Sequence, residues 1–329
     1  MTVYIVNSLE GGTVRHLAVA TFTALFCTLG IAQGAKLDPN LVPYKAPAGV
    51  TGAVTVVGSE TIDPIVRAWF SGFRKFHPDV ALKTAAEGSA AGHLALMEGT
   101  SLIGSMSREM TKPELAAFDA KYGYAPIRLV IGLDALAVFV HPGNRLSGLT
   151  FGQLDAMYST TRKQGGKEPI TTWEAAGVPE MGTRKINLYG RDESSGTRAF
   201  FKEKVLLKGE FRPGITVSDA GSLLEAVSLD AGAIGYTSVG EINSLVRTLP
   251  VGIGDGPKLL PNVDNILKGN YPLVRFLYLY VNKAPGKPLP AAVGAFLSFV
   301  LSKEGQAAVA ASVLPIPADV CRTMLAKVQ

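Results

Sequence analysis

The chain has 329 residues, of which 47% are hydrophobic and 18% are charged. A chain of this length and composition exceeds one average domain and can bury a large core, so we expect a globular protein of two lobes. Its formal net charge of +5 favours an anionic partner. The basic residues are scattered, without an arginine-rich run or a basic motif interleaved with aromatic residues, which argues against nucleic-acid binding.

The N-terminus has the features of an export signal. Arg15 and His16 precede the apolar run 17–32, and small residues follow it. We therefore predict a secretory signal peptide over residues 1–34, with a retained membrane anchor as the alternative. Removal of the signal leaves Cys321 as the remaining cysteine, so we expect no intramolecular disulfide in the exported chain.

The first predicted unit after the signal is a strand, a turn and a helix. Residues 35–50 are rich in proline and polar residues and are predicted to be a linker. A strand is expected over 53–57 and an amphipathic helix over 62–76. Ser59 and Thr61 lie in the turn, where a helix start has free N–H groups that suit an anion. An ordinary Ser/Thr cap is the simpler explanation of this turn alone.

Two further strand and turn units follow. A strand over 80–84 leads to the glycine-rich turn 87–92, and a short strand within 102–108 runs into a polar turn. The spacing of Thr111 and Glu114 then predicts a capping box at the start of a helix. Each of the three strands ends in Ser, Thr or Gly, and open α/β sheets build ligand sites at the carboxyl ends of their strands.

Two long apolar runs, 127–141 and 271–282, lack helical spacing and are predicted to be the strands that join the lobes. Lobe I is then expected to comprise residues 51–141 and 275–329, and lobe II residues 142–274. The pattern also predicts further elements: helices over 150–158, from Ser222, over 290–301 and over 303–312 after Ser302, and a strand over 233–238.

The stretch 188–201 has the pattern of a strand end, a tight loop and a helix start. Its first helical turn would offer free N–H groups and the hydroxyls of Ser195 and Thr197, and Arg191 lies just upstream as a planar fork of donors. Together these groups favour a tetrahedral oxyanion. The alternative is a serine N-cap on a surface helix, with the arginine in solvent.

The order of these motifs resembles that of the periplasmic phosphate-binding proteins, which are the substrate-binding subunits of phosphate ABC importers. The resemblance covers most of the chain after the signal and rests on residues 58–61, 87–92, 103–108, 149–154, 191–200 and 232–236. It implies the type II periplasmic-binding-protein fold, in which two α/β lobes are joined by two hinge strands. It also implies a periplasmic monomer that passes inorganic phosphate to an ABC permease in the inner membrane, without a cofactor.

The resemblance further implies which residues bind the phosphate. Glu193 stands where the family has an acidic residue that pairs with the arginine, and it would orient Arg191 from behind. The expected contacts come from lobe I through Thr61, the Ile62 N–H, Ser89 and Ser107, and from lobe II through Arg191, Ser195, Gly196 and Thr197.

One position departs from the family pattern. The familiar members have an aspartate where this chain has Ser107, and that aspartate accepts the proton that phosphate carries and sulfate lacks. A hydroxyl can donate or accept, so it rejects sulfate less strictly. Phosphate remains the expected ligand, with sulfate or another tetrahedral oxyanion as the alternative. Glu60, Asp63 and Glu87 are the candidates for a replacement acceptor.

An enzyme is the competing class of protein, in the form of a secreted phosphatase or esterase with Ser195 as its nucleophile. The sequence has no G-x-S-x-G elbow and no His/Cys/Asp cluster with metal-ligand spacing. His93 is the histidine nearest a proposed site, and His77 is expected at the surface. We therefore predict no catalytic residue, no metal site and no cofactor.

Overall fold

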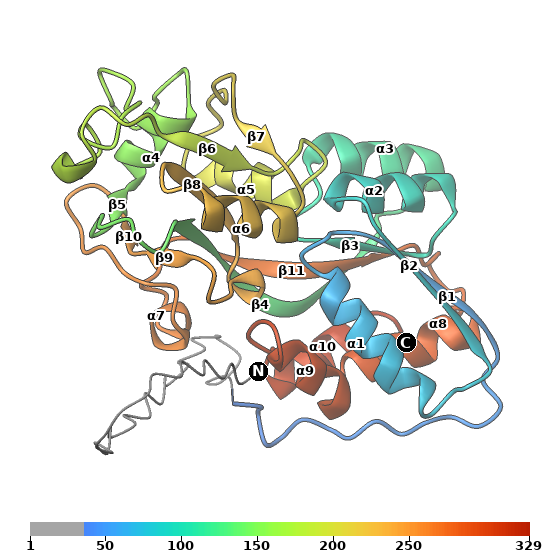
Figure 1. The fold of residues 1–329 in the computed structure, drawn as a ribbon. Coiled ribbons are helices and arrows are strands. Elements are labelled where there is room, and N and C mark those ends of the chain that lie inside the picture. Colours follow the sequence, from blue (N-terminus) through green and yellow to red (C-terminus); the bar gives the residue numbers. More distant parts are fainter. Residues whose placement is uncertain (1–35) are drawn as a thin grey trace, which may run out of the picture.

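The computed structural model describes residues 36–329, and the predicted signal peptide lies outside the described residues. Nine strands of this range form one sheet, in the order β2-β1-β3-β11-β4-β8-β6-β7, with β9 also paired to β4, and β5 and β10 form a separate sheet of two. Figure 1 shows helices around both ends of this sheet and two long strands, β4 and β11, running between the two halves.

Lobe I is built from strand and helix units that place three strand ends together. Strand β1 pairs in parallel with both β2 and β3, so the carboxyl ends of all three meet at one edge. The elements are β1 (Gly52–Gly58), α1 (Asp63–Arg74), β2 (Val80–Ala86), α2 (Ser89–Glu98), β3 (Ile103–Met106), α3 (Lys112–Tyr122), α8 (Ala291–Val300), α9 (Lys303–Ala310) and α10 (Ala318–Ala326).

Helix α1 shows why the apolar spacing in this lobe produces a helix. Its residues at spacings of three and four face inward, and Trp69 and Phe73 are both fully buried. Phe296 of α8 packs edge-on against both rings. Burial of such side chains contributes about 1.5–3 kcal/mol each, so this packing fixes α1 and the turn before it on the sheet.

The two long strands connect the lobes. Strand β4 (Ile127–Val140) pairs antiparallel with β11 (Val274–Val281), and its last five residues pair with β8. The hydrophobic core changes from that of lobe I to that of lobe II along β4 and at the start of β11. Ile131 and Leu277 belong to the core of lobe I, whereas Ala135 and Leu273 belong to the core of lobe II.

Lobe II surrounds the other half of β4. Helices α4 and α5 begin with the side-chain caps that the sequence indicated. Thr150 forms a full capping box on α4, and Ser195 caps α5. The elements are β5 (Leu149–Thr150), α4 (Phe151–Tyr158), β6 (Asn187–Gly190), α5 (Gly196–Lys204), β7 (Thr216–Val217), α6 (Ala220–Leu229), β8 (Ala233–Ser238), β9 (Arg247–Leu249), β10 (Val251–Gly252) and α7 (Val263–Leu267), with a 3₁₀ turn at Val239–Glu241.

Several sequence-based expectations of local structure need correction. Helix α6 begins before Ser222, because Asp219 is the N-cap and accepts the Ser222 N–H at 3.0 Å. His77 is buried, since its Nε2 lies 2.7 Å from the hydroxyl of Tyr44. Pattern alone gave no sign of α10, which starts directly after Pro317.

The segment expected to be a linker packs against lobe I although it contains no helix or strand. Leu41 and Val50 are buried, and the Val42 carbonyl accepts the Lys303 N–H at 2.9 Å. The Asp38 carboxylate accepts the Ala318 N–H at 2.9 Å, which satisfies the start of α10. The segment therefore joins the lobe I core as part of it.

Candidate functional site

Two helix N-termini from different lobes meet at the centre of the molecule. Helix α2 begins at Ser89 and helix α5 begins at Gly196, and the two lie on either side of the boundary between the lobes (Figure 1). The Ala90 N–H donates to the carbonyl of Ser194 at 3.2 Å, which joins the two starts directly. Because the N-terminus of a helix carries a partial positive charge, two such ends at one place give the boundary a positive potential that suits an anion.

Hydroxyl groups from both lobes converge at this boundary. The Oγ1 atoms of Thr61 and Thr197 lie 3.1 Å apart across it, and the Oγ atoms of Ser89 and Ser107 lie 3.3 Å apart within lobe I. The Ser107 N–H also donates to Ser89 Oγ at 3.0 Å. All four residues are buried, so the structure brings together predicted contacts from four separate turns.

Gly196 allows the lobes to approach closely. A Cβ atom added at this position would lie 2.2 Å from Ser89 Oγ and 2.5 Å from Ser107 Oγ, closer than any real side chain allows. Glycine at the first position of α5 is therefore needed for the two serines to contact this helix start. The predicted residue Gly196 thus lies against the predicted residues of lobe I.

Two of the predicted contacts are already used within the protein. The Ile62 N–H donates to the Ser59 carbonyl at 3.1 Å inside the β1–α1 turn. The Ser195 hydroxyl accepts the Arg198 N–H at 3.4 Å as the cap of α5. Ser195 keeps its own O–H as a donor, whereas Ile62 has no second backbone proton to offer.

Arg191 is buried, with 1% of its surface exposed, and lies between carboxylates of both lobes. Its Nη2 contacts the Glu60 carboxylate of lobe I, and its Nη1 lies 3.9 Å from Glu241 of lobe II. Thr237 accepts from Nη1 at 3.5 Å and itself donates to Glu241. Burial raises the pKa of the Glu241 carboxyl, and the Arg191 charge opposes that shift.

The structure differs from the expected role of Glu193. Glu193 is exposed, and within residues 36–329 the ion pairs of Arg191 are made with Glu60 and Glu241. The loop is instead shaped by its neighbour Asp192, whose Oδ1 accepts from the N–H groups of Ser194 and Ser195 at 2.8 and 3.1 Å. Residue 193 therefore points outward because residue 192 turns inward to cap the loop.

The structure separates the three candidates for a replacement acceptor. Glu60 reaches the site through Arg191. Asp63 is engaged by Arg67 at 2.6 Å and Thr84 at 3.0 Å on the outer face of α1. Glu87 is exposed. Among these three, Glu60 is the carboxylate positioned beside the candidate anion-binding groups.

Sequence reasoning missed the charged and polar residues that surround the site from the joining strands, from β8 and from the 3₁₀ turn after it. Asp134 and Arg275 are fully or almost fully buried, and Arg275 donates to Thr197 Oγ1 at 3.0 Å. The available signal was a charged residue inside each apolar run, which a buried strand retains only when the charge has a partner. Glu241 and Thr237 gave no comparable signal.

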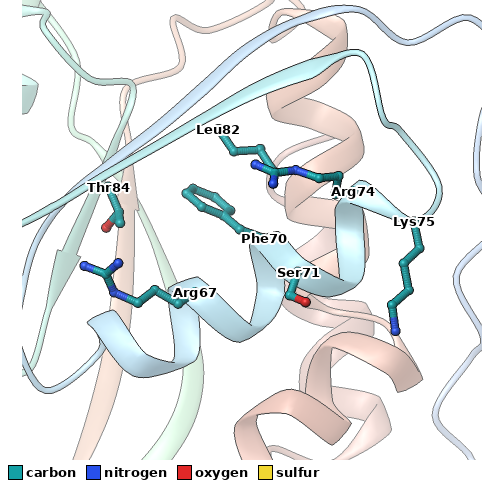
Figure 2. Close-up of a pocket in the computed structure, with 7 residues that line it drawn as sticks. All are labelled: Arg67, Phe70, Ser71, Arg74, Lys75, Leu82 and Thr84. Atoms are coloured by element: carbon teal, nitrogen blue, oxygen red, sulfur yellow. The ribbon is translucent and has the colours of Figure 1, made fainter.

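A surface cavity lies away from this site. It measures about 460 Å³ and is lined on the outer face of lobe I by Arg67, Phe70, Ser71, Arg74, Lys75, Leu82 and Thr84. Figure 2 shows these side chains along α1 and β2, with the basic groups at the rim. None of the predicted phosphate contacts lines it. The described residues contain no group of three or more His, Cys, Asp or Glu side chains arranged to hold a metal ion.

Comparison with known proteins identifies the family. A model of the PBP superfamily domain matches residues 44–304. The phosphate-binding protein PstS of Pseudomonas aeruginosa is 40% identical over 311 residues, which cover 93% of this chain and 96% of the relative. The chain belongs to the PstS family.

Solved structures agree with the PstS assignment. A putative phosphate ABC transporter substrate-binding protein with bound phosphate from Clostridium perfringens is 27% identical, with a TM-score of 0.67 over 80% of this chain and 99% of that one. A possible phosphate binding protein from Planctomyces limnophilus is 26% identical, with a TM-score of 0.60 over 85% of this chain and 98% of that one. The predicted bilobal α/β fold is confirmed.

Every helix in the described range of this PstS family member is too short or too polar to cross a lipid bilayer. The predicted signal and the alternative of a retained anchor both concern residues outside that range. The family assignment also decides between a binding protein and an enzyme. Members of this family hold a ligand and carry out no reaction on it.

Proposed function

We propose that this protein captures inorganic phosphate between its lobes and delivers it to an ABC importer. One observation carries the proposal: in a chain 40% identical to a phosphate-binding protein, donors from both lobes meet at a single buried point. The donors that would surround the phosphate are Thr61, Ser89 and Ser107 of lobe I and Arg191, Ser195, Gly196 and Thr197 of lobe II.

Closure of the lobes accounts for tight binding without catalysis. When β4 and β11 bend, lobe I moves against lobe II, and an anion can take the place of the Thr61–Thr197 and Glu60–Arg191 contacts. The donors reach their best geometry only when the lobes are shut, so binding and closure are coupled. A micromolar affinity corresponds to roughly 8 kcal/mol, which several charge-assisted hydrogen bonds supply after desolvation is deducted.

Glu60 is the proposed acceptor for the proton of phosphate. Its carboxylate contacts Arg191 Nη2, so it lies next to the position that a phosphate oxygen would take on that arginine. An ionised carboxylate only accepts, and it therefore repels sulfate, which has no proton to donate. Ser107 then serves as a hydroxyl donor, and the acceptor has moved from the β3 turn to the β1–α1 turn.

The remaining expectations belong to the same proposal. The protein is exported through residues 1–34, acts in the periplasm as a monomer without a cofactor, and meets an ABC permease of the inner membrane. We take lobe I as residues 51–141 and 275–329, with residues 36–50 packed against it, and lobe II as residues 142–274. Its basic net charge serves anion capture and no nucleic-acid role. A receptor for another oxyanion is the second candidate, and Ser107 at the aspartate position favours it.

Titration calorimetry on the mature protein tests this proposal, after bound anion has been removed by unfolding and refolding. We expect saturable binding of phosphate at one site, with sulfate much weaker. If sulfate bound as tightly as phosphate, the protein would be a general oxyanion receptor. Absence of phosphate binding would refute the proposed ligand, while the fold assignment would stand.

A further inference from the structure

The two joining strands carry a buried ion pair that faces the site. Arg275 of β11 lies directly opposite Asp134 of β4 in the antiparallel register, and their exposed fractions are 5% and 0%. Arg275 Nε and Nη2 lie 2.9 and 2.8 Å from Asp134 Oδ2. The other carboxylate oxygen, Oδ1, accepts from Ser238 Oγ at 2.7 Å. Both oxygens of Asp134 are therefore occupied.

The guanidinium of Arg275 also reaches the predicted phosphate contacts. Its Nη2 donates to Thr197 Oγ1 at 3.0 Å, and that hydroxyl lies 3.1 Å from Thr61 Oγ1. Because Thr197 Oγ1 accepts from the arginine, its own proton is directed away from Arg275 and is available as a donor. Phe200, in the second turn of α5, lies with its ring centre 5.7 Å from Arg275 Cζ and limits the plane that the guanidinium can adopt.

One nitrogen of this guanidinium has no acceptor for its N–H groups within residues 36–329. Nη1 of Arg275 is buried and has no hydrogen-bond partner among the described residues. A buried cationic N–H without an acceptor is costly, so such a group requires an explanation. A purely structural pair would engage both ends of the fork with both carboxylate oxygens. Here both contacts fall on a single oxygen, while Ser238 holds the other.

We propose that Arg275 is a second anion-binding arginine of this site, carried by β11, one of the two strands that join the lobes. The inference rests on the proposed capture of an oxyanion between the lobes. Nη1 donates to the bound anion, and Nη2 holds the Thr197 hydroxyl so that its proton points toward the same anion. Because Arg275 is part of a strand that spans both lobes, the ligand contacts lobe I, lobe II and the hinge at once.

Three variants test this role by calorimetry with inorganic phosphate, beside a matched control. The double variant Arg275→Met with Asp134→Asn removes the arginine without leaving a buried charge behind, and Asn still accepts from Ser238. We expect it to melt near the wild-type temperature and to bind phosphate at least roughly tenfold more weakly. Asp134→Asn alone frees Arg275 from its carboxylate, so we expect binding at least as tight as in the wild type.

Arg275→Lys decides the question if the double variant does not fold. A lysine retains the charge and can pair with Asp134, but its three donors share one nitrogen, which does not span the separate positions that Nε, Nη1 and Nη2 of the arginine reach. We expect several-fold weaker phosphate binding with little change in melting temperature. Arg247→Met is the control, because Arg247 of β9 also lies beside β4 with an unpaired nitrogen, yet donates to the Leu146 carbonyl at 2.8 Å.

Each result supports or overturns the inference. Phosphate affinity that is retained or increased in Asp134→Asn and reduced in the double variant supports a ligand role for Arg275. Equal losses of phosphate affinity in both variants would show that the ion pair is only structural. Wild-type affinity in the folded double variant, or in Arg275→Lys if the double variant is unfolded, would also overturn it. Absence of phosphate binding by the wild-type protein would refute the proposed function and the inference with it, and wild-type binding is therefore measured first.

Discussion

Two regions of this protein each present a buried arginine to the same point, and they do so in different ways. The loop between β6 and α5 carries Arg191, which contacts Glu60 of the opposite lobe. The hinge strands carry Arg275, which contacts Asp134 at the directly opposite position of the ladder. Opening the lobes separates the first pair, whereas the second pair moves with the strands that contain both partners.

This difference suits the two arginines to different tasks, namely selection of the anion and coupling of anion binding to the hinge. A loop residue whose partner lies in the other lobe is freed when the lobes open and can bind a ligand before they close again, so Arg191 is suited to select the anion. A strand residue fixed by its cross-strand neighbour is held in one orientation whether the lobes are open or shut. Arg275 is therefore suited to transmit the presence of the anion to the hinge.

Substitution of Arg191 should have the largest effect on phosphate binding. Arg191→Ala removes the charged donors that select the anion, and each hydrogen bond to a charged group contributes about 1.5–3 kcal/mol. Loss of two such bonds weakens phosphate binding by about 3 kcal/mol or more, which is roughly a hundredfold or more. Calorimetry with inorganic phosphate measures the loss, and circular dichroism checks that the fold is retained.

Arg67→Ala is the matched control for that variant. It removes the same unit of charge from an exposed position of lobe I, where Arg67 pairs with Asp63. Exposed pairs of this kind contribute about 0–1 kcal/mol, so we expect nearly unchanged phosphate affinity. Equal losses in the two variants would mean that overall charge attracts the anion, and the assignment of Arg191 to the site would be wrong.

Most of the fold was predictable because its signals are local. Apolar spacing indicated α1, alternation and length indicated the joining strands, and a capping pattern located the start of α3, where both bonds between Thr111 and Glu114 are present. The start of α6 was placed too late because Ser222 and Asp219 are both good caps, and only the Asp219 side chain is oriented to accept.

The site was predictable where it follows a contiguous motif and not where it depends on contacts between distant residues. The hydroxyls of Ser89 and Ser107 follow their turns and lie together beside Gly196, and the Thr197 hydroxyl lies beside that of Thr61. The partner of Arg191 was expected at Glu193, two residues away, but Glu60 lies beside it through tertiary packing. A residue brought in by lobe closure leaves no trace in local spacing, and that is why Glu60 was one of three candidates.

Glu60→Gln sharpens the comparison by changing selectivity rather than overall attraction. The amide retains the size of the side chain but is a poorer acceptor for the proton of phosphate and no longer repels sulfate. We expect the ratio of phosphate to sulfate affinity to fall roughly tenfold, since one charge-assisted hydrogen bond is lost. Asp63→Asn, three residues along and facing Arg67, is the control and should leave the ratio unchanged.

Ser107→Asp tests whether the acceptor has moved between turns. In the Glu60→Gln background we expect the new carboxylate to restore most of the lost preference for phosphate, because Ser107 lies beside Ser89 and Gly196 in the same cluster. In the wild-type background the gain should be smaller, since Glu60 already repels sulfate. If the ratio stays the same in both backgrounds, position 107 does not contact the proton of the ligand.

The smallest effect is expected behind Arg191, at Glu241, and concerns stability. Burial raises the pKa of Glu241 in the folded protein, so the protonated carboxyl favours folding. That contribution is complete below the ordinary glutamate pKa of about 4.3 and is lost as the pH rises through the higher folded value.

Glu241→Gln cannot titrate, so its stability relative to wild type should increase from pH 4 to pH 7 in urea unfolding. Glu225→Gln, at an exposed position of α6, is the control. A difference for Glu241→Gln that does not change with pH would mean that Arg191 fully compensates the buried charge.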